Sequence, residues 1–532
     1  MIYIDNLKKE INTRTLFEIK NLTIGEDNKI GLIGDNGAGK TSFFKILIGQ
    51  DTDYSGKIDV QIKIAHLLND DEEEKFSHDN YVKAKLNKEE KFSPGEYQRL
   101  KLAKLLSNEH SFLLIDEPTS HLDIKQKKKL AESLRNRDKG YILISHDRDF
   151  INQTCDKIFE LSHGELEVFN GNYSFYLDER IKRKKFAQKE YEGYVNEKKR
   201  LTGIANDIKV QSSKVRTTPK RMGNSEARLH KMGGQGNKKK LDKQVKSIKS
   251  RIDQLEVKEK PKEEAEIKLT IDEKDKIFSK VLVRSEKLSK SFDDKVLFDN
   301  ANLEIPNKKK IALLGDNGSG KTTILNMIVD KEVWCHPNLK IGYYSQLGEI
   351  IDEKKTVLEN VFESSIYDQT MTRIILARLG FKEDEVFKMV DVLSDGERAK
   401  VKLAKLVTSD FNFLIMDEPT NFLDIRAIEA LEDLLIGYDR PLLFVTHDVS
   451  FINNIADGLI IIKNKKLESF SGNLAQYQNR REKLKENKNS NDFLIEFRLS
   501  AINNRLASEI TKEEREELEA EYERLLKQRD NN

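Results

Sequence analysis

Four short motifs occur twice in this chain, in the same order, and this repetition constrains the fold more than any other feature. Each copy has a glycine-rich loop, a Ser-x-Gly-Glu turn, an apolar run ending in Asp-Glu, and a Ser/Thr-His-Asp triplet. The last three recur after 301 residues, as between Asp116 and Asp417, and the loops after 281 residues, as between Lys40 and Lys321. We therefore infer two copies of one module.

The glycine-rich loops, GDNGAGKT and GDNGSGKT, both fit the pattern G-x-x-x-x-G-K-[ST] between a predicted strand and a predicted helix. Backbone N–H groups of such a loop wrap a polyphosphate, the lysine adds positive charge, and the threonine hydroxyl can ligate Mg²⁺. A chance glycine-rich turn would lack the flanking strand and helix. The predicted ATP-binding residues are Gly34, Asp35, Asn36, Gly37, Ala38, Gly39, Lys40, Thr41 and Ser42, and then Gly315, Asp316, Asn317, Gly318, Ser319, Gly320, Lys321, Thr322 and Thr323.

Four apolar residues followed by Asp-Glu predict a buried parallel strand that carries two carboxylates at its C-terminal end. Two adjacent carboxylates are costly to bury without a cation, although a buried structural acid is the alternative for each. We expect Asp116 and Asp417 to hold Mg²⁺ through water. Glu117 and Glu418 are expected to polarise the attacking water.

His146 and His447 each follow an apolar strand and precede an aspartate. A single histidine in such a place is more often structural, but its recurrence in both copies favours a catalytic role as a sensor of the γ-phosphate. The Ser-x-Gly-Glu turns open helices, whose N-terminal N–H groups would face a phosphate. Their predicted ATP-binding residues are Ser93, Gly95 and Glu96, and Ser394, Gly396 and Glu397.

A strongly basic segment, Arg180 to Lys262, separates the two copies. It holds 26 Lys or Arg and 9 Asp or Glu, a net charge of +17, whereas the whole chain carries +2 and the remainder therefore −15. This one-signed excess indicates a polyanionic partner, and a solvated hairpin without a ligand is the alternative. Two heptad seams predict an antiparallel helical hairpin with arms of about 30 residues, each reaching roughly 45 Å. The seams are Ala187, Tyr191, Tyr194, Lys198, Leu201, Ala205 and Ile208, and Leu241, Val245, Ile248, Ile252 and Leu255.

The tip of this hairpin is expected near residues 209–225. Pro219 and Gly223 should end the first helix, and Ser225 should start another. The tip has no aromatic residue, so phosphate contacts and shape are favoured over base stacking, as for folded RNA. The predicted RNA-binding residues are Lys214, Arg216, Lys220, Arg221 and Arg228.

Composition excludes several other classes of protein. No apolar run approaches the ~18 residues of a membrane span, and the first residues resemble neither a signal nor a transit peptide. Cys155 and Cys335 lie far apart without neighbouring His or Cys pairs, which argues against a zinc cluster and a disulfide framework. We expect a cytoplasmic protein.

The ordered motif set, given twice, resembles tandem ATP-binding cassettes. Copies that end in GNYSFY and GNLAQY, with a basic helical linker between them, resemble the ABC-F family, whose members act on ribosomes. The resemblance implies an α/β fold: two ABC-type P-loop ATPase domains, a long antiparallel α-helical hairpin and a short helical C-terminal extension. The expected boundaries are 1–178 and 280–478 for the cassettes, 179–279 for the linker and 479–532 for the extension.

The resemblance also implies a function. Such a protein hydrolyses ATP to ADP and phosphate with Mg²⁺ and is a monomer off the ribosome. It enters the E site of the bacterial 70S ribosome, where its tip meets large-subunit rRNA and P-site tRNA near the peptidyl-transferase centre. Residues 218–233 and the C-terminal extension resemble the antibiotic-resistance branch, which displaces lincosamides, streptogramin A or pleuromutilins. A housekeeping ABC-F translation factor is the nearest alternative; the ATPase subunit of a transporter and a DNA-associated ATPase are others.

Head-to-tail closure, as in cassette proteins, would pair the loop of each copy with the Ser-x-Gly-Glu turn of the other. The second site would add Gln346 as a Mg²⁺ ligand and Phe292 as the residue that stacks on adenine. The first copy has Asn69 and Ile11 at these two places. Unequal sites are therefore expected, with Glu418→Gln slowing turnover more than Glu117→Gln.

The copies also differ at their signatures and in the length of one arm. Pro94 stands in the first signature and lacks an N–H, whereas Asp395 brings negative charge to the second. From Asn69 to Ser93 the chain advances 24 residues, and from Gln346 to Ser394 it advances 48. We therefore expect a shortened helical subdomain in the first cassette.

Overall fold

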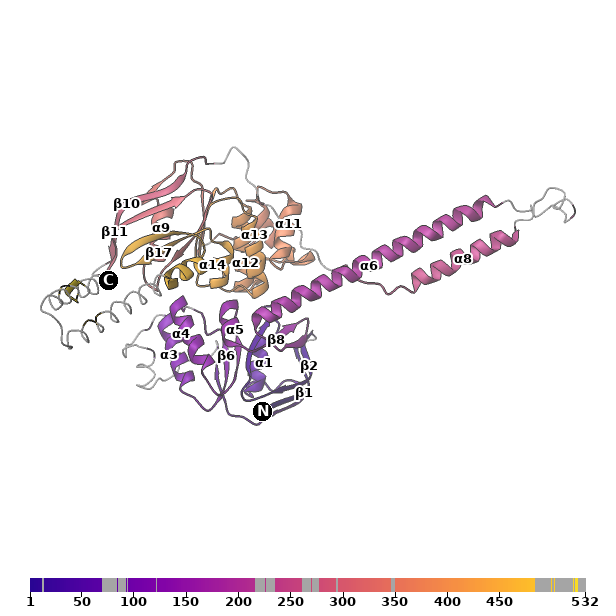
Figure 1. The fold of residues 1–532 in the computed structure, drawn as a ribbon, viewed down its shortest axis with the longest axis horizontal. Helices are drawn as coiled ribbons and strands as arrows, with labels where there is room; N and C mark the ends of the chain where they lie inside the picture. The colour runs from indigo at the N-terminus through magenta and orange to yellow at the C-terminus, as the bar shows by residue number, and fades with distance from the viewer. Residues whose placement is uncertain are drawn as a thin grey trace. The chain divides into compact units, whose positions relative to one another are not determined.

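The computed structural model describes residues 1–11, 14–68, 84, 92, 94–120, 122–215, 225, 235–260, 269, 277–292, 295–345, 350–483, 499, 502, 520 and 522–524. The chain divides into two compact units (Figure 1). One unit combines Met1–Asn170 with Glu266–Asn532, called here the first and second lobes, and the other is Gly171–Ala265.

The first lobe is built on a nine-stranded sheet in the order β4-β1-β2-β9-β8-β3-β7-β6-β5. At its centre β3 (Lys29–Gly34) lies parallel to β7 (Tyr141–Ile144) and β8 (Lys157–Ser162). Strand β6 (Phe112–Asp116) is buried throughout and pairs in parallel with both neighbours, which confirms the predicted buried parallel strand. The other strands are β1 (Ile2–Ile11), β2 (Arg14–Ile24), β4 (Ser55–Val60), β5 (Ile64–Leu67) and β9 (Glu165–Phe169).

Helices of the first lobe bring apolar side chains to this sheet. Phe43 and Phe44 in the helix that follows the glycine-rich loop are fully buried with Ile30 and Leu114 of the sheet. Burying aromatic side chains of this size is worth a few kcal/mol each, so it holds the loop firmly against the end of β3. The helices are α1 (Lys40–Leu47), α3 (Pro94–Leu106), α4 (Ile124–Arg135) and α5 (Arg148–Thr154).

The second lobe repeats this plan with a six-stranded sheet, β14-β15-β16-β12-β17-β18, and a three-stranded sheet, β11-β10-β13. Its parallel strands are covered on both faces: Ile311 and Leu313 of β12 enter one core, and Ala312 and Leu314 enter the other. The strands are β10 (Val281–Phe292), β11 (Lys295–Pro306), β12 (Lys310–Leu314), β13 (Trp334–Cys335), β14 (Ile341–Tyr344), β15 (Phe413–Asp417), β16 (Leu442–Val445), β17 (Gly458–Lys463) and β18 (Lys466–Ser471).

A helical insert lies between β14 and α12 of the second lobe. In the first lobe the matching stretch is described only at Ala84 and Phe92, so Asn69, Ser93 and the expected shortening of this subdomain lie outside the described residues. The helices of the second lobe are α9 (Lys321–Val329), α10 (Val357–Phe362), α11 (Gln369–Arg378), the 3-10 helices η2 (Glu383–Phe387) and η3 (Val390–Val392), α12 (Asp395–Thr408), α13 (Ile425–Ile436) and α14 (Val449–Ile455).

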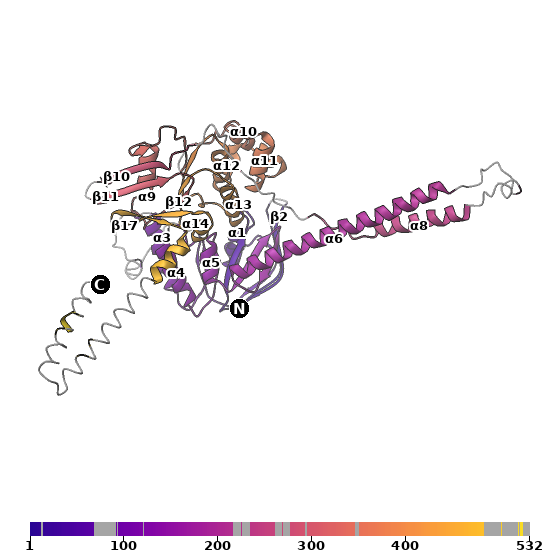
Figure 2. The ribbon, with the colours of Figure 1, turned by 45° about the horizontal axis from the view of Figure 1, so that its top comes forward.

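The second unit is the predicted helical hairpin, formed by α6 (Tyr173–Lys214) and α8 (Gln235–Asp253), which lie side by side (Figures 1 and 2). Leu201 and Ala205 are buried and the α8 seam residues are half-buried, whereas Ala187 and Lys198 are exposed. The Ser212 hydroxyl continues the seam and donates to Asp242 Oδ1 at 2.6 Å. Helix α6 has 42 residues and so extends roughly 63 Å, which is longer than the arm we expected because it already begins at Tyr173.

Several expectations fall outside the described residues. They are the helix break at Pro219 and Gly223, the candidates Arg216, Lys220, Arg221 and Arg228, and most of the C-terminal extension. Lys214 is the last residue of α6. Among the described residues, no helix combines the length and the apolar character needed to span a bilayer.

Candidate active sites

Each glycine-rich loop connects the end of a central strand to the start of a helix, β3 to α1 and β12 to α9. Gly39 and Gly320 adopt φ values of +98° and +99°, which other residues rarely tolerate. A Cβ would lie 2.7 Å from Leu16 at Gly39 and 2.6 Å from Phe298 at Gly320. Glycine is therefore required where each loop turns into its helix, whose first N–H groups have no partner within the helix.

The loop lysines fold back over their own loops. Lys40 Nζ donates to the carbonyl oxygens of Gly34 at 2.8 Å and Asp35 at 3.0 Å. Lys321 Nζ does the same with Gly315 at 2.9 Å and Asp316 at 3.3 Å. Burial lowers the pKa of both lysines, against the opposing effect of nearby carboxylates. Each ammonium group is thus held at the centre of a loop suited to a polyphosphate.

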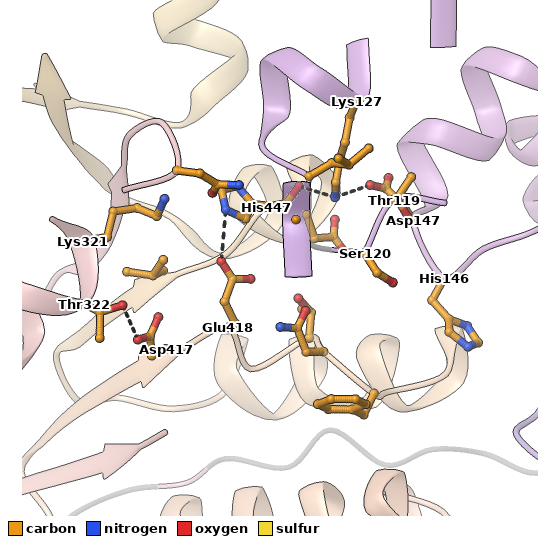
Figure 3. Close-up of a pocket in the computed structure, with 18 of the residues that line it drawn as sticks. Thr119, Ser120, Lys127, His146, Asp147, Lys321, Thr322, Asp417, Glu418 and His447 are labelled. Carbon is orange, nitrogen blue, oxygen red and sulfur yellow. Dashed lines mark hydrogen bonds and ion pairs between the residues drawn. The ribbon is translucent and has the colours of Figure 1, made fainter. Parts of the chain in front are cut away.

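A hydroxyl and a carboxylate meet beside each loop. Thr41 Oγ1 donates to Asp116 Oδ2 at 2.9 Å. Thr322 Oγ1 donates to Asp417 Oδ2 at the same distance, as Figure 3 shows. Burial raises the pKa of Asp417, although the Thr322 hydrogen bond opposes the shift. Oxygen donors of this kind suit Mg²⁺, which takes few protein ligands when it also binds phosphates.

The glutamate after each aspartate has an unusual backbone and an unusual pKa. Glu117 and Glu418 adopt φ values of +46° and +51°, in the left-handed region that costs a non-glycine residue free energy. Burial, reinforced by the adjacent aspartate, raises the pKa of Glu117 to about 8 and that of Glu418 to about 7. Backbone strain combined with a raised pKa in a polar cleft is typical of a catalytic carboxyl group.

Each glutamate faces a histidine. His146 Nε2 lies 3.5 Å from Glu117 Oε1, and His447 Nε2 lies 3.5 Å from Glu418 Oε1. Burial, and next the charge of the loop lysine, lowers the pKa of both histidines to about 3. Both imidazoles are therefore neutral at physiological pH and can each donate one hydrogen bond.

The two lobes contribute jointly to these sites. A cavity of about 550 Å³ is lined by Gly95 of the first lobe together with Lys321, Thr322 and Glu418 of the second. On the other side, Asn36 Nδ2 donates to the Phe422 carbonyl oxygen at 3.3 Å, and a Cβ on Gly396 would lie 3.2 Å from that same nitrogen. The structure thus brings each loop next to the opposite Ser-x-Gly-Glu turn, as the head-to-tail expectation requires.

Comparisons with known proteins agree with this arrangement. A family model described as "ABC transporter" matches residues 17–81 and 298–421. The ribosome protection protein VmlR of Bacillus subtilis (strain 168) is 31% identical over 509 residues, which cover 91% of each chain. The erythromycin resistance ATP-binding protein MsrA of Staphylococcus epidermidis is 31% identical over 81% of this chain and 91% of its own. ABC transporter F family member 5 of Arabidopsis thaliana is 30% identical over 71% of this chain and 52% of its own.

The chain belongs to the ABC-F family. It is therefore an ATP-hydrolysing ATPase with two ATP-binding cassette domains, which the two lobes contain. A solved structure of the RNase-L Inhibitor covers 90% of this chain and 92% of its own, with a TM-score of 0.57 and 19% identity, and this likeness concerns the fold alone.

The other residues of this ABC-F protein that the sequence predicts at the ATP sites differ in exposure and in hydrogen bonding. Phe292 and Ile11 are 53% and 49% exposed at the ends of β10 and β1. Ser394 caps α12 in a reciprocal capping box with Glu397, whereas α3 begins directly at Pro94. Glu96 lies 3.8 Å from Arg99, and Ser319 Oγ is buried without a hydrogen-bond partner among the described residues. Gln346 lies outside the described residues.

Among the ion pairs between the lobes of this ABC-F protein, two involve equivalent positions of the two repeats and were not predicted from the sequence. Lys125 Nζ lies 2.7 Å from Asp316 Oδ2, and Arg426 Nη1 lies 3.0 Å from Asp35 Oδ2. Each cation stands two residues after Asp123 or Asp424, which cap the helix that follows the Asp-Glu strand. Lys125 and Arg426 are separated by the same 301 residues as the motifs. A position-by-position comparison of the two repeats could therefore have found them.

Proposed function

We propose that this ABC-F ATPase acts on the bacterial 70S ribosome and protects it from antibiotics bound near the peptidyl-transferase centre. The observation that carries the proposal is the hairpin of α6 and α8, which lies in a segment of net charge +17, Arg180 to Lys262, between two ATPase lobes. Relatives named for ribosome protection and erythromycin resistance support it.

At the ATP sites, the residues present fit ATP and Mg²⁺. Bound Mg²⁺ would neutralise charge on the outer phosphates, held by the pairs Thr41–Asp116 and Thr322–Asp417 and, at the second site, by Gln346. Each loop lysine would bind the outer phosphates. The carboxylate of Glu117 or Glu418 would orient the attacking water, and the neutral histidine would donate a hydrogen bond to the γ-phosphate.

The hairpin would contact the ribosome through its basic far end. Lys209 and Lys214 on α6, and Lys239, Lys240 and Lys243 on α8, are exposed and free to meet phosphates. In this proposal the linker, residues 179–279, enters the E site in the ATP-bound state. The linker then contacts large-subunit rRNA and P-site tRNA through Lys214, Arg216, Lys220, Arg221 and Arg228. This contact displaces lincosamide, streptogramin A or pleuromutilin drugs from the ribosome, and the protein acts in the cytoplasm.

Co-sedimentation tests the ribosomal part of the proposal. A Glu117→Gln/Glu418→Gln double variant should retain ATP and migrate with 70S ribosomes through a sucrose gradient containing ATP. A Lys40→Ala/Lys321→Ala double variant is the control, because it lacks the charges that hold the phosphates. If the glutamine variant stays at the top of the gradient, the proposal is wrong.

Drug susceptibility tests the protective part. Changing Lys214, Arg216, Lys220 and Arg221 to Gln should abolish resistance in an expressing strain while ATP binding persists. The matched control changes four exposed lysines of the lobes, Lys20, Lys57, Lys128 and Lys466, to Gln. A parent chain that confers no resistance to any of the three drug classes would favour the housekeeping translation factor.

A further inference from the structure

Charged residues at the contact between the lobes break the symmetry of the repeat. At the interval of 301 residues, Lys127 corresponds to Ile428, Arg148 to Val449, and Glu432 to Ala131. At each of these positions one copy has a charged residue and the other an apolar one. The two ATP sites consequently have different neighbours, although their motifs match.

Lys127 reaches from α4 of the first lobe into the second ATP site (Figure 3). Its ammonium group donates to Asp147 Oδ2 at 2.6 Å and to the carbonyl oxygen of His447 at 3.0 Å. The side chain is only 13% exposed, so the low local dielectric strengthens both contacts. Asp147 is itself fixed, because its other oxygen caps α5 by accepting from Phe150 N at 3.0 Å.

A second cation extends this connection across the lobe contact. Arg148 Nη1 donates to Glu432 Oε2 at 3.0 Å, and Arg148 Nη2 donates to the other oxygen of the same carboxylate. Arg148 Nη2 also lies 3.6 Å from Asp448 Oδ2. Asn454 Nδ2 donates to the same Glu432 carboxylate at 3.1 Å. Asp448 directly follows His447, so both lobes hold the short segment that carries this histidine.

We propose that Lys127 is a positioning residue for the second ATP site, which fixes His447 from the opposite lobe and has no counterpart at the first site. His447 faces Glu418 at 3.5 Å, and the contact with Lys127 holds the backbone of this histidine from the opposite lobe. The His447 carbonyl loses the Lys127 ammonium when the lobes separate. Hydrolysis at the second site therefore depends on lobe closure through this contact, which the first site lacks. The inference rests on the proposed catalytic roles of Glu418 and His447.

The experiment separates the two sites by removing one glutamate at a time. In the Glu117→Gln background only the second site turns over, and in the Glu418→Gln background only the first does. In the Glu117→Gln background, Lys127→Met should lower kcat roughly tenfold, since small misplacements of catalytic groups are costly. In the Glu418→Gln background, the same substitution should leave kcat within about twofold. Lys127→Arg, which keeps the charge, should recover most of the loss. Lys128→Met, an exposed neighbour on the same helix, is the matched control.

The outcomes distinguish positioning from simple docking. Equal losses in the two backgrounds would mean that Lys127 merely helps the lobes to close, and no loss in either would mean that it has no role; both results overturn the proposal. The parent single variants are measured first. If neither glutamine substitution slows turnover, the catalytic assignment fails, and that failure is visible before Lys127 is changed.

Discussion

At both ATP sites a lysine bonds two carbonyl oxygens of its own loop, a threonine bonds an aspartate at 2.9 Å, and a histidine lies 3.5 Å from a glutamate. The surroundings differ. The second site has exposed Phe292 and the ammonium of Lys127, whereas the corresponding positions around the first are Ile11 and Ile428. Duplication has thus kept the contacts within each lobe, whereas Phe292 at the periphery and Lys127 on the opposite lobe are each replaced by isoleucine at the first site.

The largest expected difference between the sites concerns their glutamates. Glu418→Gln should lower ATP turnover by roughly a hundredfold, because it removes a general base. Glu117→Gln should cost less, since its carboxyl is largely protonated near neutral pH. Steady-state phosphate release measures both. Equal losses in the two single variants would contradict the inequality of the sites.

The pH dependence should sharpen the same comparison. A general base works when deprotonated, so turnover should rise with pH through the pKa of the active glutamate. The acidic limb of kcat/KM should have its midpoint near pH 7 when only Glu418 remains and near pH 8 when only Glu117 remains. At pH 7 the ionised fractions would then be about one half and about one tenth. Coincident midpoints would show that the surroundings do not tune the two carboxyl groups differently.

Adenine stacking offers a smaller effect. Phe292→Ala should raise KM for ATP about fivefold in the Glu117→Gln background, because an aromatic contact is worth about 1 kcal/mol. Ile11→Ala in the Glu418→Gln background should change KM less than about twofold. A larger shift for Ile11 than for Phe292 would place the adenine elsewhere.

The two equivalent ion pairs between the lobes, made by Lys125 and Arg426, should give the smallest difference. Lys125 is 72% exposed and pairs with one carboxylate, so Lys125→Met should cost about 0–1 kcal/mol of ATP-dependent closure. Arg426 contacts Asp35, Glu160 and Ser162 and is 39% exposed. Arg426→Met should therefore weaken closure more, as measured by energy transfer between dyes on the two lobes. The reverse ranking would contradict this account of the interface.

Much of the fold could be predicted because it depends on short-range patterns. The loop GDNGAGKT contains in eight consecutive residues the glycines and the lysine that its geometry needs. The heptad spacing of Leu201 and Ala205 placed them correctly in the hairpin seam. The exposed positions of Ala187 and Lys198 were not predicted, because periodicity shows which helix face is apolar but not how far its partner extends.

Residue order alone therefore determined the family, the duplication and the chemistry of each loop, since these follow from groups close together in the chain. Only the tertiary structure decided which residues meet between the lobes. Lys127 and His447 are 320 positions apart, and their contact depends on how two folded surfaces dock. A lysine on a helix is ordinarily a solvated charge. Lys127 is part of the second ATP site because it is buried between the Asp147 carboxylate of the first lobe and the His447 carbonyl of the second.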